Sequence, residues 1–588
     1  MSFSNSDLWA SRTALVCIAV VSAVWQRKLS SIVPDPYLDE VFHVRQAQVY
    51  CSGAFSQWDP KITTPPGLYL VSYLVYLVTG RCDIDILRLV NITAICGILL
   101  SSFRILRLLR EARGKEANRV DFQSGRRLQG FLFDAHSALN ISLFPPLFFF
   151  SALYYTDVVS TLCVLESYIT LLQSRRPRAS ELGSTVQTIL LGIVALLFRQ
   201  TNIFWVAVFP AGLAVLEVLK NGRASAENNA TTKQTPLEAL KHSWTHSTLY
   251  DCPVNQAGVE DYFIVIVSAG LAAVGRLPSL MKVAVPYFTL LVAFGGFVAW
   301  NGGVVLGDKS NHVATLHFSQ MLYIWPYIFF FSFPLTIPLF LTPLSNRLFQ
   351  GKIQPFLEAH LSIPTTSKPP RIIIAIICMI LATLTVHYNT IIHPFTLADN
   401  RHYVFYVFRI LRHHPQLKYL AVPAYYCCGW LVMHTLGISR DSQIPNQAES
   451  SSKTSRGKEL KRAAAPAGDH SCPASFVLVW LATTTLSVVT APLVEPRYFI
   501  IPWIMWRLHV PSTAAGGGSS STPRAEKIAS KPLSGVTGKV PALWQGYDLR
   551  LCLETGWHLA VNTVTAYIFL YRGFVWPQEP GKIQRFMW

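Results

Sequence analysis

The sequence predicts an all-α polytopic membrane protein with about 11–14 transmembrane helices, on three observations. Hydrophobic residues make up 51% of the 588 positions, and charged residues make up 14%, against about 25% in soluble proteins. Apolar runs recur from one end of the chain to the other. Aromatic residues reach 12%, which a disordered chain would not carry. A soluble globular enzyme and a disordered chain are therefore both excluded.

The predicted spans follow from the rule that roughly 20 apolar residues cross a bilayer. The first run lacks a basic leader and a cleavage site, so we expect it to be retained. We treat 262–276 as non-spanning and place 67–79 at the membrane interface. The spans we expect are 8–25, 86–109, 131–153, 157–173, 186–198, 203–219, 283–300, 323–343, 371–391, 417–437, 474–490, 496–508 and 557–575.

Polar connectors of two kinds alternate between these spans. One kind is basic and rich in small residues, which is typical of cytoplasmic loops. This topology accounts for the net charge of +18 without nucleic-acid binding. We expect 1–588 to be a single transmembrane domain with three polar, cytosolic inserts, at 220–258, 438–473 and 509–548.

The other kind of connector is compact and holds aromatic, acidic, basic and amide side chains. If the first span runs outward from the cytosol, all of these connectors fall on the opposite side of the membrane. Cys51 and Cys82 flank the first of them and could form a disulfide, whereas no zinc-ligand spacing is present. The compact connectors are Pro36–Pro66, Phe198–Asn202, Gly307–Gln320, His393–Tyr406 and Leu493–Pro502.

The first compact connector begins with two adjacent acids, Asp39 and Glu40. On a helix that starts there, Asp39, His43 and Gln46 would share one face. A carboxylate near the membrane surface can take up a proton in catalysis. The alternative is that both acids cap an interfacial helix. Asp59, ahead of the Pro65-Pro66 pair, is a further acid in the same connector.

The later compact connectors place one or two cations among acids, amides and aromatic rings. Arginine and lysine there could hold an anionic phosphate, and the neighbouring groups suit a sugar. The alternative is that these residues are surface ion pairs and interfacial anchors. The triplet Asp83-Ile84-Asp85 has a metal-binding pattern, but it directly precedes an apolar helix, which favours capping. No essential metal is expected.

Several long strings together resemble one family. It comprises the eukaryotic dolichyl-phosphate-glucose-dependent alpha-1,2-glucosyltransferases, which add the terminal glucose to the lipid-linked oligosaccharide. The strings are Tyr37–Gln48 (YLDEVFHVRQAQ), Gln57–Leu68 (QWDPKITTPPGL), Gly307–Phe318 (GDKSNHVATLHF), His393–Tyr406 (HPFTLADNRHYVFY), Glu495–Pro502 (EPRYFIIP) and the C-terminal Arg585–Trp588 (RFMW).

The resemblance implies a GT-C-type helical bundle in the endoplasmic reticulum membrane, with its active site facing the lumen. The implied reaction transfers glucose from dolichyl phosphate glucose to the diglucosylated lipid-linked oligosaccharide, Glc2Man9GlcNAc2-PP-dolichol. A beta donor gives an alpha product, so the anomeric centre inverts. Apart from these two substrates and membrane lipids, we expect no cofactor, no obligate protein partner and no nucleic acid.

Inversion needs one base for the acceptor hydroxyl and positive charge for the departing phosphate. We assign the base to Asp39, with Glu40 and Asp59 as competitors. The residues assigned to the donor phosphate are Lys309, Arg401 and Arg497. The residues assigned to sugar and acceptor binding are His43, Gln46, Trp58, Asp308, His312, His317, Asp399, His402 and Glu495.

Two alternatives remain open at this stage. A transporter or flippase of lipid-linked sugars would place its distinctive charges near the bilayer midplane. Here they lie at the ends of spans, which favours chemistry at the membrane surface. A non-catalytic scaffold would need its loops only to fold.

Overall fold

The computed structural model describes residues 5–116, 124–176, 180–221, 235–309, 315–336, 338–339, 371–392, 394–438, 472–491, 493–512 and 547–588. Within these ranges the chain is helical apart from loops and one short hairpin, in which β1 (Phe574–Val575) pairs antiparallel with β2 (Ile583–Gln584). The prediction of an all-α membrane protein is confirmed, and the GT-C type stays a prediction.

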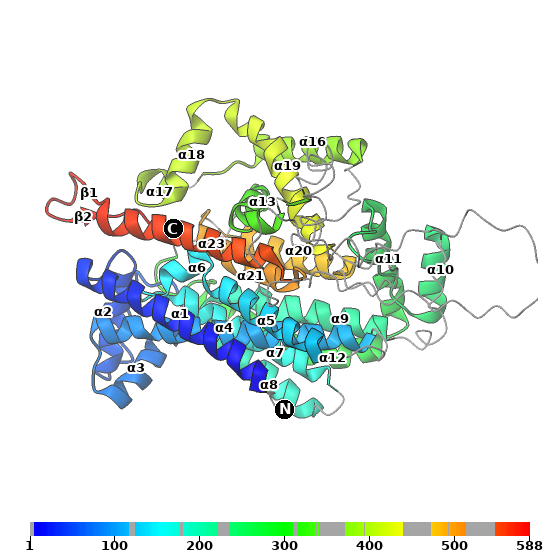
Figure 1. Cartoon of the computed structure of the whole chain (residues 1–588), viewed down its shortest axis with the longest axis horizontal. Helices are drawn as coiled ribbons and strands as arrows, with labels where there is room; N and C mark the ends of the chain where they lie inside the picture. The colour runs from blue at the N-terminus through cyan, green and yellow to red at the C-terminus, as the bar shows by residue number, and fades with distance from the viewer. Residues whose placement is uncertain are drawn as a thin grey trace, which may run out of the picture.

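The N-terminal half forms one side of an elongated helical bundle (Figure 1). Helix α4 is central to it, because it packs against α1, α5 and α7. The helices of this half are α1 (Asn5–Ile32), α4 (Ile84–Glu116), α5 (Ser124–Ser142), α6 (Pro145–Phe150), α7 (Thr156–Ser174), α8 (Glu181–Leu196), η1 (Gln200–Asn202), η2 (Phe204–Val208), α9 (Phe209–Lys220) and α12 (Leu277–Asn301).

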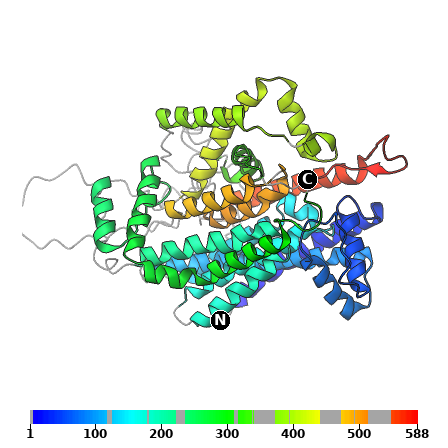
Figure 2. The same cartoon turned by 180° about the vertical axis from the view of Figure 1, so that it is seen from behind.

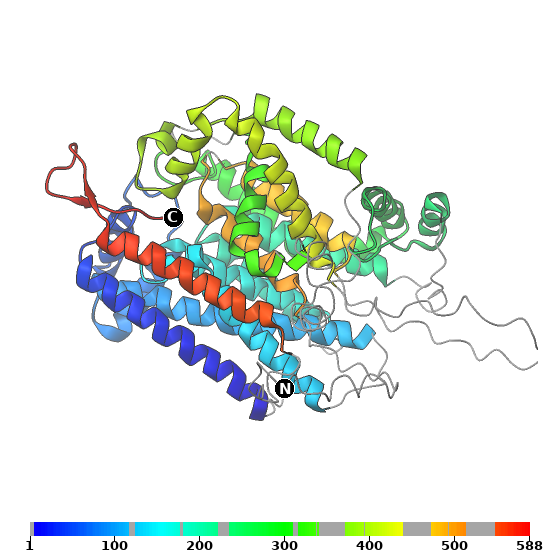
Figure 3. The same cartoon turned by 45° about the horizontal axis from the view of Figure 1, so that its top comes forward.

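The C-terminal half covers the other side of the bundle. Helices α13, α20, α21 and α23 lie against the N-terminal half, and α16, α18 and α19 form an outer flank (Figures 1 and 3). The elements of this half are α13 (Gln320–Phe331), α16 (Ile372–Tyr388), α17 (Pro394–Ala398), α18 (Tyr403–His413), α19 (Leu417–Leu436), α20 (Ala474–Val489), η5 (Pro496–Phe499), α21 (Ile500–His509) and α23 (Leu549–Tyr571).

The two ends of the bundle differ. Helices α2 (Glu40–Cys51) and α3 (Gly67–Thr79) lie at one end together with the hairpin (Figures 1 and 2). At the opposite end, α10 (Pro236–His246) and α11 (Val259–Val274) run across the direction of the long helices. The treatment of 262–276, most of which lies in α11, as non-spanning stays a prediction.

Four helical stretches in the described part of the chain are long and apolar enough to cross a membrane: Trp9–Ile32, Ile84–Ala112, Gln200–Lys220 and Leu277–Asn301. Shorter apolar helices occupy Gly67–Thr79, Glu181–Leu196, Gln320–Phe331, Ile372–Tyr388 and Ala474–Val489. These elements are consistent with a polytopic protein, whereas the count of 11–14 stays a prediction.

Proline divides one expected span. The run 131–153 is not one helix, because α5 ends at Ser142 and α6 begins at Pro145. The pair Pro145-Pro146 lacks backbone N–H donors, so it can begin a helix but cannot continue one. The first span is instead longer than expected and reaches Ile32. The insert 220–258 is described except for 222–234, whereas most residues of 438–473 and 509–548 lie outside the described ranges.

A buried ion pair joins two helices of the C-terminal half. The Arg507 guanidinium on α21 donates to both Glu554 carboxylate oxygens on α23, at 2.7 Å each. Both side chains are shielded from solvent, and Asn140 on α5 donates to the same carboxylate at 2.8 Å. Charges inside a bundle are costly unless they are paired in this way. The pair therefore fixes α23, whose far end leads to the hairpin.

Candidate active site

A disulfide closes the first compact connector. Cys51, at the end of α2, bonds to Cys82, just before α4, with their Cα atoms 6.5 Å apart. The expected pairing is thus present. Because it ties both ends of the segment that contains α3, it holds the connector against the bundle.

Asp39 stands at the N-cap of α2, but its carboxylate makes no capping hydrogen bond. The capping alternative is therefore wrong for this side chain. It lies instead 3.4 Å from Nη1 of Arg497, with 51% of its surface exposed. The preceding Leu38 has φ of +53°, a left-handed conformation that is uncommon outside glycine. This turn aims the carboxylate toward Arg497.

Glu40, the neighbouring acid, is completely buried. Its carboxylate accepts two hydrogen bonds from Arg88 on α4, both at 2.8 Å. It also accepts from the backbone N–H groups of Tyr37, at 3.1 Å, and Tyr154, at 2.8 Å. With its oxygens occupied inside the protein, Glu40 serves as an anchor for the start of α2.

Arg497 lies at the centre of a cluster of charged groups. Its guanidinium is 2.8 Å from Glu495, 3.4 Å from Asp39 and 3.8 Å from Asp157. Asp157 lies in the first turn of α7, has a side chain that is 2% exposed and pairs with Arg199 at 2.6 Å. Two arginines and three acids thus meet where η1, η5 and the starts of α2 and α7 come together.

These charges act on one another's proton affinity. The protein displaces water around Asp39, which would raise its pKa, but Arg497 and, to a smaller extent, His402 lower the pKa of Asp39 below its ordinary value. Glu495, Asp157 and Asp39 in turn surround the Arg497 guanidinium and compensate its charge. Asp39 is therefore ionised at neutral pH beside a cation.

Gln46 holds the middle of the first connector in place. Its amide nitrogen donates to the Gln57 carbonyl at 2.8 Å, and its amide oxygen accepts from the Asp59 N–H at 2.9 Å. The Asp59 carboxylate accepts from the Lys61 N–H at 2.9 Å, and Trp58 donates to the Ile62 carbonyl at 3.3 Å. Both functions of Gln46 are thus engaged in shaping the loop that presents Asp59.

His43 lies on the same helix, one turn beyond Asp39. Its Nδ1 is 2.7 Å from the Tyr69 hydroxyl, and its ring packs edge-on against Tyr155 with centroids 5.9 Å apart. Burial lowers the pKa of His43 despite the opposing effect of Asp39. The ring is therefore neutral and lines the space behind Asp39.

Arg401 is engaged in an ion pair within its own loop. It donates from Nε and Nη2 to the two Asp399 oxygens, both at 2.8 Å, and stacks over the Trp576 ring at 4.6 Å. His402 lies 3.7 Å from the same carboxylate and 3.2 Å from the Trp588 carbonyl oxygen. This loop contacts the segment after the hairpin. Arg401 and Arg497 are not in contact with each other in the described part of the chain.

The connector after α12 packs on the first one. The Asp308 N–H donates to the Pro60 carbonyl at 2.8 Å, and the Lys309 ammonium donates to the Asn301 carbonyl at the end of α12. His317 is buried, and its N–H donates to the Val489 carbonyl at 2.9 Å. The structure thus places Asp308 beside the first loop and His317 against α20. His312 lies outside the described residues.

Two members of the charged cluster, Asp157 and Arg199, were absent from the sequence-based assignment. Asp157 was counted as the first residue of a span, and Arg199 lay in the short connector 198–202, which holds one cation. The positions of Asp157 and Arg199 in the sequence could have indicated them. Each lies at the end of an expected span, on the side assigned to the compact connectors. The ion pair joins residues that are 42 positions apart, and no local sequence pattern predicts it.

The triplet Asp83-Ile84-Asp85 does not gather around a common point. Asp83 pairs with Arg81 at 2.9 Å, and Asp85 accepts from the Ser30 hydroxyl at 2.8 Å. Across the described ranges, no group of three or more His, Cys, Asp or Glu side chains is arranged to hold a metal ion. The expectation of a metal-free site stays a prediction.

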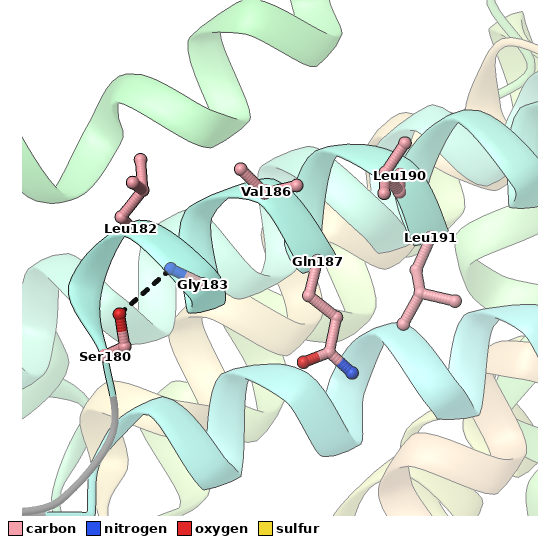
Figure 4. Close-up of a pocket in the computed structure, with 7 residues that line it drawn as sticks. All are labelled: Ser180, Leu182, Gly183, Val186, Gln187, Leu190 and Leu191. Carbon is pink, nitrogen blue, oxygen red and sulfur yellow. Dashed lines mark hydrogen bonds between the residues drawn. The ribbon is translucent and has the colours of Figure 1, made fainter.

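A surface hollow of about 530 Å³ lies along α8, away from this cluster. Figure 4 shows its lining, which carries no charged side chain. The Ser180 hydroxyl accepts from the Gly183 N–H at 3.3 Å and caps the helix there. The hollow runs over the apolar start of α8, whereas the far end of α8 meets the first connector through Leu197 and Gly67. The only polar side chains in its lining are those of Ser180 and Gln187. The lining residues are Ser180, Leu182, Gly183, Val186, Gln187, Leu190 and Leu191.

The two adjacent acids should respond oppositely to substitution. We expect Glu40→Gln to destabilise the protein by about 3–5 kcal/mol, because Arg88 would remain buried without a counter-charge. Asp39→Asn should change stability by less than about 1 kcal/mol, since it removes a half-exposed pair. Thermal unfolding of the detergent-solubilised protein measures both. Asp83→Asn, from an exposed pair, is the control, and equal unfolding temperatures for Glu40→Gln and wild type would contradict the anchoring role.

Comparisons with known proteins identify the family of this chain. Residues 33–508 match the DIE2/ALG10 family. A protein of Aspergillus fumigatus and one of Emericella nidulans are each 41% identical over 98% of both chains, and a mouse protein is 30% identical over 98% of both. All three are named Dol-P-Glc:Glc(2)Man(9)GlcNAc(2)-PP-Dol alpha-1,2-glucosyltransferase. No solved structure matches. Since the match covers most of the chain, this protein belongs to the DIE2/ALG10 family.

Proposed function

We propose that this protein transfers glucose from dolichyl phosphate glucose to Glc2Man9GlcNAc2-PP-dolichol, with inversion, forming the terminal alpha-1,2-linked glucose. The observation that carries the proposal is similarity over the full chain to transferases named for this reaction. The charged cluster at one end of the bundle supports it, because it offers an accessible acid beside arginines. A transporter would use charges along the bundle, where the Arg507–Glu554 pair is instead closed upon itself.

Asp39 is the base in this proposal. Of the three candidate acids, Glu40 is committed to Arg88, and Asp59 has no contact with the arginine cluster among the interactions described. Asp39 is half exposed and faces Arg497, so an acceptor hydroxyl can approach its free side. An inverting transfer needs a single base on the face opposite the leaving phosphate.

Arg497 and Arg199 hold the departing phosphate. Both can donate to phosphate oxygens through a planar fork. They share the acid Asp157, which keeps the two guanidinium groups in one place. This proposal retains Arg497 and adds Arg199, while Arg401 and Lys309 are held by Asp399 and Asn301 at the edge of the site.

Donor binding would strengthen the base. Asp39 is the most exposed of the three acids around Arg497, so a phosphate that reaches this arginine competes with Asp39 first. Sharing Arg497 with a phosphate weakens the effect that lowers the pKa of Asp39. A higher pKa makes the carboxylate a better proton acceptor. The acid is thereby activated when the donor is in place.

The remaining assigned residues serve sugar and acceptor binding in this proposal. His43 offers a neutral ring beside Tyr155, and Trp58 and Asp59 lie on the loop that Gln46 holds. Asp308 borders the same loop. Asp399, His402 and Glu495 complete the rim, while His312 and His317 stay predictions.

Asp39→Asn should abolish transfer while leaving donor binding intact. We expect a loss of about 10²–10⁴-fold in kcat, the usual contribution of a general base. Transfer from dolichyl phosphate glucose to a diglucosylated acceptor by the purified protein measures it. Asp59→Asn is the matched control, and a larger loss in that variant than in Asp39→Asn would move the base to Asp59.

Chelation should leave activity unchanged. Because the leaving group is a single phosphate and arginines can neutralise it, the reaction needs no divalent ion. Transfer assayed with and without EDTA tests this expectation. A loss in EDTA that added Mg²⁺ or Mn²⁺ restores would contradict it.

The site faces the lumen of the endoplasmic reticulum in this proposal. The Cys51–Cys82 disulfide supports this side, because disulfides persist in oxidising compartments and are rare in the cytosol. The basic connectors on the other side agree with the positive-inside rule.

A new glycosylation site tests this orientation. Ala54→Asn creates an Asn-X-Ser motif in the turn after α2, and we expect one glycan that endoglycosidase H removes. The natural motif Asn229-Ala230-Thr231, in a predicted cytosolic insert, is the internal control and should stay unmodified. A glycan at Asn229 without one in the Ala54→Asn turn would reverse the orientation.

A further inference from the structure

The segment that follows the hairpin returns to the catalytic end of the bundle. Figures 1 and 3 show the chain turning back at β2 and running to a point beside α17. Gln584 is 2% exposed, Arg585 is 8% exposed and Met587 is 1% exposed, so these three side chains are packed inside the protein, whereas Ile583 is exposed. We propose that residues 583–588 are a positioning element of the active site. They hold the Asp39 turn and the 399–403 loop in fixed positions relative to each other. This inference rests on the proposed function.

The first contact is with Tyr37, two residues before Asp39. The Tyr37 hydroxyl accepts from the Arg585 N–H at 2.7 Å and donates to the Arg585 carbonyl at 2.8 Å. The Arg585 guanidinium in turn donates to the Phe569 and Leu570 carbonyls, at 2.8 and 2.7 Å. Tyr37 is thereby fastened to the end of α23 through both of its hydroxyl hydrogen bonds.

Tyr37 also controls the backbone that carries Asp39. Its N–H donates to Glu40 at 3.1 Å, and its carbonyl accepts from the Tyr155 hydroxyl at 3.3 Å. Between these fixed points Leu38 keeps its left-handed conformation, with φ of +53°. Such a conformation persists where its surroundings enforce it. Arg585 supplies one of those restraints from the far end of the sequence.

The second contact is with the 399–403 loop. The Met587 N–H donates to the Arg401 carbonyl at 2.9 Å, and the Tyr403 N–H donates to the Met587 carbonyl at 3.1 Å. The Gln584 side chain accepts from Arg401 at 3.1 Å. These hydrogen bonds join the loop to the segment in the way that neighbouring strands of a sheet are joined. The segment therefore fixes the position of the backbone at Arg401 and His402.

The two contacts lie on one short stretch. Arg585 holds the Asp39 turn, and Met587, two residues later, holds His402 and its neighbours. His402 also contributes to the electrostatic environment of Asp39. A shift of the segment would therefore move the proposed base and one wall of its site together. Neither Arg585 nor Met587 touches the charged cluster directly among the described interactions, which makes them positioning residues.

Tyr37→Phe tests the inference with a single hydroxyl. It leaves the Arg585 N–H and carbonyl unpaired, and we expect kcat for glucosyl transfer to fall at least about tenfold. Tyr403→Phe is the matched control: it removes a hydroxyl from the same interface, and that hydroxyl has no hydrogen-bond partner among the described residues. Tyr403→Phe should keep wild-type activity.

The pH dependence separates positioning from a simple loss of folded protein. Asp39 is faced by Arg497, His43 and His402, and Arg497 is also faced by Asp157 and Glu495. If Asp39 moves away from Arg497, its pKa rises, so the acid limb of kcat/KM in Tyr37→Phe should shift to higher pH. Loss of folded protein scales the rate equally at every pH.

A truncated chain and the Asp39→Asn variant complete the experiment. A chain that stops after Lys582 should lose transfer while it still binds dolichyl phosphate glucose. Wild-type rates and an unshifted acid limb in Tyr37→Phe, alongside an inactive Asp39→Asn, overturn the positioning role alone. Full activity of Asp39→Asn would instead overturn the proposed base. A loss in Tyr403→Phe equal to that in Tyr37→Phe would also refute the inference.

Discussion

The ion pair between Glu40 and Arg88 fixes the point from which the end of the protein that holds the candidate active site is built. Two charges removed from water cost several kcal/mol each, so the pair is favourable only with full hydrogen bonding. Here Arg88 meets both carboxylate oxygens, and the N–H groups of Tyr37 and Tyr154 complete them. The start of α2 is thereby locked to α4 and to the turn before α7. Asp39, one residue earlier, is left to face the other way, toward Arg497.

Much of the fold could be predicted from the sequence, because membrane insertion depends on composition over windows of about 20 residues. The helical class and the side shared by the compact connectors rest on such patterns. The Cys51–Cys82 pair was only a possibility, raised by the positions of the two cysteines on either side of one connector. Helix ends were less predictable. The break at Pro145-Pro146 divided a run that composition alone treats as one span, and α1 continued past its apolar stretch to Ile32.

The site was predictable in part, for a physical reason. Asp39 and Arg497 are marked by local context, as charged residues beside apolar spans. Partner choice is different, because it depends on which loops meet in space. Arg401 was assigned to a phosphate, yet Asp399, two residues away, occupies its guanidinium. Arg199, assigned no role, reaches across to Asp157 and enters the cluster. A cation's sequence neighbours cannot show which acid it meets.

The placement of the acids also sets the chemistry that they can do. Asp39 precedes α2, and Asp157 lies in the first turn of α7, where the helix dipole favours negative charge. Asp39 is held ionised before any substrate arrives, in a cluster of three carboxylates around two arginines. An ionised acid with a lowered pKa is a weak base. In the proposed mechanism, a donor phosphate that enters this cluster adds negative charge and competes for Arg497. It would thereby raise the proton affinity of Asp39 when the acceptor hydroxyl must lose its proton. In this proposal the donor phosphate and Asp39 share Arg497. Donor binding to a site with excess negative charge is thereby coupled to catalysis.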